Sequence, residues 1–533
     1  MLNTTIDRKD ADLRKSLMIF KPTHDLNPHQ AYRIKKLQRQ LDRAESYDEW
    51  KSIALKLDHE SGAQEWKYDN SSPYFDAEII SHRLNLLRKY QFNKRVMDLM
   101  YILREGLSHD IANIGHPMLF AHTYIGTKKL IEDYIEEVSK SLVFIASQAC
   151  DSLSLKEKLE FFENCQLAYG QPAMMFSGGA SLGLFHSGVC KALIEQDLMP
   201  KVLSGSSAGA MMTAMLGVSN AQEITQLLTG ESFYSEAFHF RSFKELIRGN
   251  GGIADVRYLK KFLVENLGDY TFKEAYEKSG LDINISVAPY DVTQEDARIM
   301  NKYTAPDLLV WSAVLASCAV PILFPPVRLT SKRYDGVHTP YLASIRWVDG
   351  SVRSDFPQEK MARLYNINYT IASQVNPHIV PFMQSDAERF RTDLLSWPER
   401  IVRKHGKTIA MDVMNFTRDR MGRVPTVRRL LDHGYGIVDQ RYYGDLNIVG
   451  NYSLRHYHYM LQNPRPHLFK ILQREGERAT WAKISSIEAH ARIGKTIEHC
   501  LAQLKSNLNK CDAIEPHSPQ TPKETSISAQ ASR

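Results

Sequence analysis

Residues 172–218, PAMMFSGGASLGLFHSGVCKALIEQDLMPKVLSGSSAGAMMTAMLGV, alternate short apolar runs with longer segments of helical pattern. The runs 172–176 and 201–205 are bounded by proline, glycine and serine, and each has the length of a buried strand. The segments after them repeat apolar residues every three or four positions, which is typical of helices. Strand, helix, strand and helix in this order predict a parallel sheet covered by helices, an α/β fold.

The same alternation continues along the chain. Apolar runs at 282–290, 344–348 and 367–375 are predicted as further strands. Residues 306–321 are predicted as a helix that ends at a proline, because proline lacks the backbone N–H. We therefore expect one α/β domain over 172–375.

The flanks of this domain have a different pattern. Residues 28–165 and 380–505 are rich in charge and repeat apolar residues at helical spacing, so we expect a helical region on each side. Residues 1–27 have the character of a loose leader. The polar, Pro/Ser/Thr-rich tail 506–533 is expected to be disordered.

The composition is that of an intracellular globular protein. The net charge is +6, which suits an anionic lipid surface and is too small to indicate nucleic-acid binding. The six cysteines show no paired or metal-type spacing, so we expect reduced thiols and neither metal nor cofactor. The N-terminus lacks the apolar core of a signal peptide, and no window reaches the roughly 18 apolar residues of a membrane span. We expect a cytoplasmic protein that meets a membrane or lipid droplet only peripherally.

One segment concentrates the positive charge. Residues 388–430 contain eleven Lys and Arg against five acidic residues, a net charge of +6. Two interpretations stay open, an interfacial segment that docks on anionic lipid or a solvated helical face. Binding to vesicles that depends on salt and on anionic lipid would favour the first.

The clearest chemical motif lies between the second predicted strand and the helix after it. GSSAG (205–209) fits G-x-S-x-G, the turn that places a nucleophilic serine between a strand and a helix. Gly205 and Gly209 let the backbone pass close to itself, and the helix directs its free N–H groups at the serine oxygen. The neighbouring serines lack glycine at both flanking positions. Ser207 is therefore the predicted nucleophile.

Two further elements are expected at the same edge of the sheet. SGGASLG (177–183) follows the first strand, and its small residues can turn several N–H groups toward one point, which suits an oxyanion. A dinucleotide loop is the alternative, but Ala180 stands where G-x-G-x-x-G needs glycine. Asp349 ends a predicted strand, where it would accept the serine proton or orient a histidine. An ordinary Asp-Gly turn is an equally good interpretation.

Together these motifs resemble the patatin-like phospholipase domain. The glycine loop, the GSSAG that follows it, DGS at 349–351 and WSAVLASCAVPILFPPV at 311–327 match its sequence blocks. Flanking stretches such as YDEWKSIALKLDHESGAQEWK and GERATWAKISSIEAHARI are similar to the branch that contains triacylglycerol lipases of yeast type. The resemblance covers roughly 45–505. It implies a three-layer α/β/α domain with a mainly parallel sheet and a helical region before it.

The resemblance also implies a Ser–Asp dyad that hydrolyses lipid esters without histidine. Carried over to this chain, Ser207 is the nucleophile and Asp349 the base. An acyl-enzyme forms on the serine, and water then releases it. The N–H groups of the oxyanion hole are expected from Gly178, Gly179, Ala180 and Ala208.

Differences from the family pattern, and alternative interpretations of the site, affect the expected substrate and mechanism. Leu182 stands where the family usually has Lys or Arg, which favours neutral acylglycerols and hence a triacylglycerol lipase. Phospholipase A or lysophospholipase activity is the alternative. An α/β-hydrolase with the order Ser–Asp–His would use His378 as its histidine. A lipid-surface scaffold without activity is the rival from another class.

Overall fold

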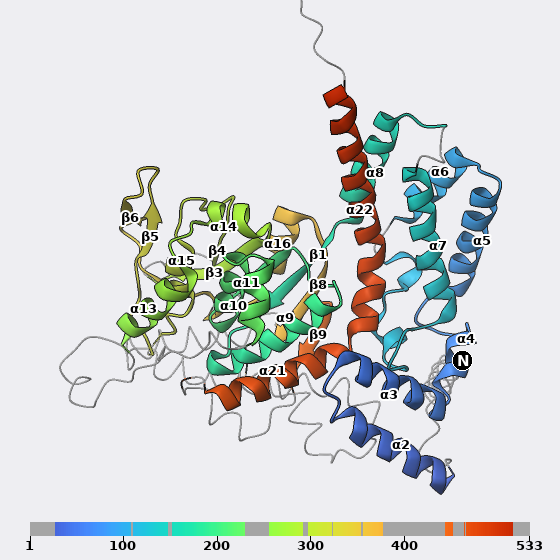
Figure 1. Ribbon diagram of the computed structural model, residues 1–533, viewed down its shortest axis with the longest axis horizontal. Coiled ribbons are helices and arrows are strands. Elements are labelled where there is room, and N and C mark those ends of the chain that lie inside the picture. Colours follow the sequence, from blue (N-terminus) through green and yellow to red (C-terminus); the bar gives the residue numbers. More distant parts are fainter. Residues whose placement is uncertain are drawn as a thin grey trace, which may run out of the picture.

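The computed structural model contains a helical N-terminal region, an α/β domain and two long C-terminal helices (Figure 1). The mostly parallel sheet and the helical regions on both sides of it confirm the predicted fold class. Within the described ranges no helix is long and apolar enough to cross a membrane. The structure describes residues 27–107, 110–147, 152–229, 255–290, 297–321, 323–352, 355–376, 443–450, 463 and 465–514.

Helices α2 to α8 form the N-terminal region. Asn27, Ser46 and Ser154 cap α2, α3 and α8 by accepting an N–H of the first turn, which is why each helix begins where it does. The apolar faces of α5 to α8 pack into a core of their own, which α22 completes. The bounds are α2 Pro28–Leu41, α3 Tyr47–Glu60, α4 Ala63–Tyr68, α5 Ala77–Phe92, α6 Val96–Gly106, α7 Lys129–Ala146 and α8 Leu155–Tyr169, with 3-10 turns η1 Ile111–Asn113 and η2 Pro117–Phe120.

The α/β domain is built on one large sheet in the order β4-β3-β2-β1-β8-β9. Strands β3, β2, β1, β8 and β9 are parallel neighbours, whereas β4 and β7 pair antiparallel with β3. The strands are β1 Gln171–Phe176, β2 Val202–Gly205, β3 Asp282–Pro289, β4 Arg298–Met300, β7 Trp347–Asp349, β8 Ile367–Gln374 and β9 Leu446–Val449, beside a separate hairpin of β5 Leu329–Lys332 and β6 His338–Tyr341.

Helices cover both faces of the large sheet, which makes three layers. Successive side chains of a strand point to opposite faces. Met174 and Phe176 of β1 therefore join the large core with α9, α10 and α15, while Ala173 and Met175 join a smaller core with α16. The helices are α9 Phe185–Glu195 after the 3-10 turn η3 Ala180–Leu184, α10 Ala208–Gly217, α11 Ala221–Thr229, α13 Val256–Leu267, α14 Phe272–Ser279, α15 Val310–Ser317, α16 Gln358–Tyr365 after the 3-10 turn η4 Gly350–Val352, α21 Pro466–Trp481 and α22 Ile484–Ile514.

The C-terminal helices connect the two halves of the molecule. Helix α21 crosses α9 at a pair of glycines, where no side chain fits between the backbones. A Cβ on Gly188 would lie 1.8 Å from the carbonyl oxygen of Gln473, and one on Gly476 would lie 2.2 Å from that of Phe185. Helix α22 packs instead on α7 and α8 of the N-terminal region (Figure 1).

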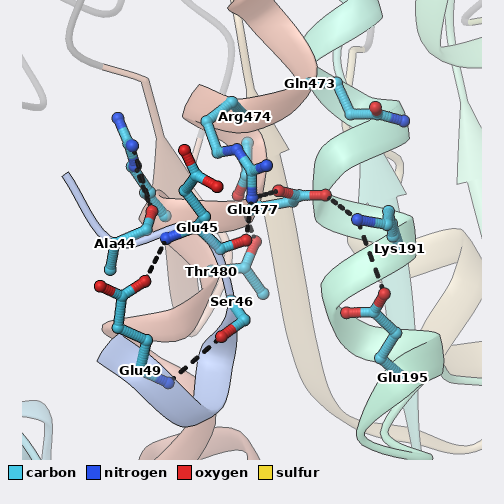
Figure 2. Close-up of polar contacts among 12 residues, drawn as sticks. Ala44, Glu45, Ser46, Glu49, Lys191, Glu195, Gln473, Arg474, Glu477 and Thr480 are labelled. Carbon is cyan, nitrogen blue, oxygen red and sulfur yellow. Dashed lines mark hydrogen bonds and ion pairs between the residues drawn. The ribbon is translucent and has the colours of Figure 1, made fainter. Parts of the chain in front are cut away.

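A charged cluster marks the place where α9, α21 and the segment between α2 and α3 meet (Figure 2). Glu477 of α21, whose side chain is 2% exposed, pairs with Lys191 of α9 and with Arg474 at 2.7 Å. Arg474 also donates to the backbone oxygen of Glu45. One buried carboxylate thus holds three segments that are far apart in the sequence.

Two expected boundaries need correction. Strand β9 lies within 380–505, where only helices were expected, because a four-residue edge strand leaves no recognisable sequence pattern. Helix α22 continues to residue 514 and so enters the tail 506–533 that was expected to be disordered. Its packing on α7 and α8 explains the helix, since Leu501 and Leu504 are buried there. Residues 1–26 of the expected leader lie outside the described residues.

Candidate active site

Ser207 lies in the turn between β2 and α10. Its backbone has φ +50° and ψ −119°, a conformation that residues with side chains rarely adopt. The flanking glycines permit this turn. A Cβ on Gly205 would lie 2.2 Å from the carbonyl oxygen of Gly209, and one on Gly209 would lie 2.1 Å from that of Phe176. The local sequence therefore folds into a strained strand–turn–helix.

Side chains from α15 and its C-terminal end hold this turn in place. The Ser207 N–H donates to Ser317 Oγ at 2.9 Å, and the Ser317 hydroxyl donates to the Ser286 carbonyl at 2.7 Å. The thiol of Cys318 lies 3.4 Å from the Ser207 carbonyl oxygen. These contacts use the backbone of Ser207. Its hydroxyl lies at the start of α10, where the helix dipole is positive.

Asp349 lies at the same edge of the sheet as Ser207. It ends a strand whose direction is opposite to the one expected. Strand β7 pairs antiparallel with β3, with Asp349 opposite Val287, whereas a strand parallel to its neighbours was expected. It enters from beyond the end of β3 and stops after three residues. Its last residue therefore lies at the carboxyl edge of the parallel strands. A strand this short carries no information about direction in its sequence.

The Asp349 carboxyl group is fully buried. Burial, together with the charge of Asp355, raises its pKa to about 7, although hydrogen bonds from the N–H and hydroxyl of Ser351 lower it. Oδ1 accepts the Ser351 N–H at 2.8 Å, while Oδ2 has no hydrogen-bond partner among the described residues. The Ser207 hydroxyl is close enough to lower the pKa of Asp349. Among the described residues, Oδ2 is thus the oxygen whose capacity to accept a hydrogen bond is unused.

The glycine loop after β1 passes over Ser207. A Cβ on Gly178 would lie 3.3 Å from the Ser207 Cβ, so the loop backbone is in contact with the serine. Gly179 has φ +155° and Ala180 has φ +50°. The second value is one that glycine adopts more easily than alanine.

Two predicted features of this loop change in the structure. The Gly178 N–H donates to Asp355 at 3.2 Å, so the other three predicted donors remain for an oxyanion. Leu182 is 1% exposed and belongs to the large core. Its side chain therefore packs inside the domain and does not face a substrate headgroup.

His186 of α9 supports the loop from inside the protein. The ring is fully buried, its Nε2–H donates to the Ser177 carbonyl at 3.0 Å, and its Nδ1 accepts the Ser373 hydroxyl at 2.7 Å. Burial lowers its pKa to about 4, so the ring is neutral. Both ring nitrogens are occupied, so His186 ties the loop to β8 and does not act on Ser207.

The sequence analysis missed Asp355, a second buried carboxylate at this site. It accepts the hydroxyl of Ser206, the N–H of Gly178 and the side-chain amide of Asn376. The stretch RWVDGSVRSDFP contains both aspartates. Nothing in the local pattern separates the second from an ordinary surface acid, because its partners come from distant parts of the chain.

Several predicted features lie outside the described residues. They include His378 of the rival triad and the basic segment 388–430. In the part of the chain that the structure describes, no group of three or more His, Cys, Asp or Glu is placed to hold a metal ion.

Comparison with known proteins identifies two matching families. Residues 28–167 match a domain of unknown function (DUF3336), and residues 174–361 match the patatin-like phospholipase family. The chain is 32% identical to triacylglycerol lipase ptl3 of Schizosaccharomyces pombe, over 86% of this chain and 95% of that protein. It is 31% identical to triacylglycerol lipase 4 of Saccharomyces cerevisiae and to triacylglycerol lipase SDP1L of Arabidopsis thaliana. These two matches cover 89% of this chain, but only 54% and 59% of the relatives.

Among solved structures, the crystal structure of VipD from Legionella pneumophila is similar to this chain. The TM-score is 0.29 at 14% identity, over 65% of this chain and 76% of that chain.

Proposed function

Because this chain belongs to the patatin-like phospholipase family, in the branch of the triacylglycerol lipases, we propose that it releases fatty acid from acylglycerols through an acyl-enzyme on Ser207. The protein is a lipid ester hydrolase. One observation carries the assignment of residues. The strained Ser207, the open Oδ2 of Asp349 and the glycine loop converge at one edge of the sheet.

In the proposed acylation step, Ser207 Oγ attacks the ester carbonyl carbon while its proton passes to Asp349 Oδ2. The carbonyl oxygen gains negative charge, which we expect the N–H groups of Gly179, Ala180 and Ala208 to stabilise. The tetrahedral intermediate then collapses. The bond to the glycerol oxygen breaks, and the proton on Asp349 moves to this oxygen, so that the alcohol leaves neutral.

Deacylation repeats the same chemistry with water. Asp349 takes a proton from water as the water oxygen attacks the acyl carbon, and the Ser207 oxygen leaves and recovers that proton. Fatty acid is released, and the enzyme returns to its starting state. A pKa near 7 suits this exchange, because a base near the working pH both accepts and returns the proton.

Access to an insoluble substrate requires contact with its surface. We propose that the protein docks peripherally on a membrane or lipid droplet through positive charge. Helix α2 supports this, since it carries Arg33, Lys35, Lys36 and Arg39 and no acidic residue. The segment 388–430 remains a second candidate from its charge alone.

Fatty-acid release by wild type and Ser207→Ala tests the proposal, with trioleoylglycerol emulsion and phosphatidylcholine vesicles offered side by side. Ser204→Ala is the matched control. Ser204 lies in β2, and its buried hydroxyl has no partner among the described residues, so alanine should leave activity unchanged. We expect Ser207→Ala to lose all release and wild type to prefer the triacylglycerol.

Other outcomes point to the rivals. Preference for phosphatidylcholine would make the protein a phospholipase A. Equal release by wild type and Ser207→Ala would remove Ser207 as the nucleophile, and failure of wild type to react with a fluorophosphonate would favour the scaffold. Complete loss of release in a folded His378→Ala would favour a Ser–Asp–His triad over the dyad.

A further inference from the structure

Asp355 takes no part in the steps above, yet it is among the most heavily hydrogen-bonded groups near Ser207. Its Oδ1 accepts both the Ser206 hydroxyl and the Gly178 N–H, the second at 3.2 Å. Its Oδ2 accepts the Asn376 side-chain amide at 2.6 Å, and the Gln374 amide adds a further hydrogen bond. An ionised carboxylate only accepts hydrogen bonds, so donors on both oxygens favour the charged form.

The donors to Asp355 come from separate parts of the proposed site. Ser206 immediately precedes the nucleophile, Gly178 opens the loop whose backbone contacts Ser207, and Asn376 follows β8. Because the turn and the loop both donate to Oδ1, this one atom determines how far apart they lie. Asp355 is 1% exposed, so water does not compete for these bonds.

Given the proposed function, we propose that Asp355 is a positioning residue that sets the distance between Ser207 and the N–H groups of the oxyanion hole. Such donors act when they lie about 2.7–3.1 Å from the developing oxyanion. A displacement of about 1 Å in a reacting group lowers a rate roughly a hundredfold.

Only a carboxylate satisfies the donors at position 355. Asparagine has one acceptor oxygen and one NH₂ group. Its NH₂ would face either the Asn376 amide or the hydroxyl and N–H of Ser206 and Gly178, so one donor would meet another. The Asp355→Asn variant therefore keeps the size of the side chain and breaks the link between turn and loop.

The charge of Asp355 gives the test a second readout. Burial raises the pKa of Asp355 to about 6 despite its donors, so it is ionised at neutral pH. This charge raises the pKa of Asp349. Burial, and then the charge of Asp349, raise the pKa of the neighbouring Cys318 thiol, which therefore stays neutral. Removing the charge at 355 should lower the pKa of the base, which loss of a merely structural contact would not do.

The experiment measures kcat and KM for p-nitrophenyl butyrate across pH, because a soluble ester avoids the lipid interface. The purified full chain is compared with Asp355→Asn. We expect kcat to fall about tenfold to a hundredfold, with KM changed far less. The midpoint of the acidic limb of kcat/KM should move down by about one pH unit. The rate of fluorophosphonate labelling should fall in parallel with kcat.

Asp58→Asn is the matched control. Asp58 of α3 is also fully buried and accepts the N–H groups of Tyr124 at 2.8 Å and Ile125 at 3.0 Å, in the segment before α7. This variant should lose stability while its kcat and pH midpoint stay those of wild type. Wild-type kcat in Asp355→Asn, or a lowered kcat with an unmoved pH midpoint, would overturn the proposal.

A second variant tests the positioning role of Asp355 if Asp355→Asn does not fold. Ser206→Ala removes a single donor to Asp355, and we expect it to lower kcat without raising KM. Wild-type kcat in folded Ser206→Ala would refute the positioning role. Ser207→Ala, assayed in parallel, distinguishes failure of the proposed function from failure of the positioning role. If Ser207→Ala retains activity, the proposed function fails. If Ser207→Ala is inactive while Asp355→Asn and Ser206→Ala keep wild-type activity, only the role of Asp355 fails.

Discussion

Ser207 holds a backbone conformation that costs on the order of 1–3 kcal/mol, and the rest of the turn keeps it there. Gly205 and Gly209 remove the clashes, and Ser317 binds the Ser207 N–H. The result is a hydroxyl held at the N-terminal end of α10, near a carboxyl group whose pKa is raised by burial. Strain and burial both work against stability, which is typical of functional sites.

The raised pKa of Asp349 predicts how activity depends on pH. The folded-state pKa is about 7 against an ordinary 3.8, and the base acts only when it is deprotonated. Activity should therefore be full above pH 7 and fall about tenfold per unit below it. The profile of kcat/KM for a soluble ester checks this. A midpoint near 4 would contradict the buried base.

The same shift has the opposite sign for stability. A carboxyl whose pKa is raised on folding binds more protons in the folded state between about pH 4 and pH 7. Its contribution to the free energy of unfolding is therefore favourable at the acidic end and is lost as the pH rises to 7. Asp349→Asn should abolish the activity and remove this part of the stability curve.

Helices α9 and α21 show how a distant element supports the site. Their backbones touch at Gly188 and Gly476, and α9 continues directly from the glycine loop. Glu477 fixes the pair by its bonds to Lys191 and Arg474 (Figure 2). A helix from the C-terminal region is thereby part of the support of the loop that contacts Ser207.

Glu477→Gln should lower the free energy of unfolding by about 1–3 kcal/mol. Removing one partner of a fully buried pair costs about 3–5 kcal/mol, but the side chains of Lys191 and Arg474 are 34% and 35% exposed and can regain water. Urea unfolding measures the change. Glu195→Gln is the control, because Glu195 pairs with the same lysine at 3.6 Å but is 48% exposed. Equal effects of the two variants would show that burial of Glu477 does not matter.

The C-terminal end of the chain packs on the N-terminal region. Helix α21 packs on the α/β domain and α22 on the N-terminal helices, so the two halves share one continuous C-terminal support (Figure 1). Helix α2 lies at the outer side of this assembly, with its cations exposed. Surface charge of one sign attracts an anionic membrane within about a Debye length.

Replacement of Lys35, Lys36 and Arg39 by Glu should weaken binding to phosphatidylserine-containing vesicles at least about tenfold, since each cation near the surface contributes about 1 kcal/mol. Vesicle co-sedimentation at low and high salt measures this, and high salt should abolish the difference. The control is Lys35→Arg with Lys36→Arg, which keeps the charge. Undiminished binding of the Glu variant would place the docking surface elsewhere, and hydrolysis of a soluble ester should be the same in all three proteins.

The order of strands and helices in 172–218, the turn around Ser207 and the glycine loop can be predicted from the sequence alone. These features depend on periodicity and on glycine at fixed offsets, which act over a few residues and are therefore visible in the chain. The direction of β7, the edge strand β9 and the role of α21 depend instead on tertiary packing. This packing also brings Asp355 to Ser206, 149 residues away in the sequence. Contacts between distant segments depend on how whole elements pack, and no local pattern encodes them.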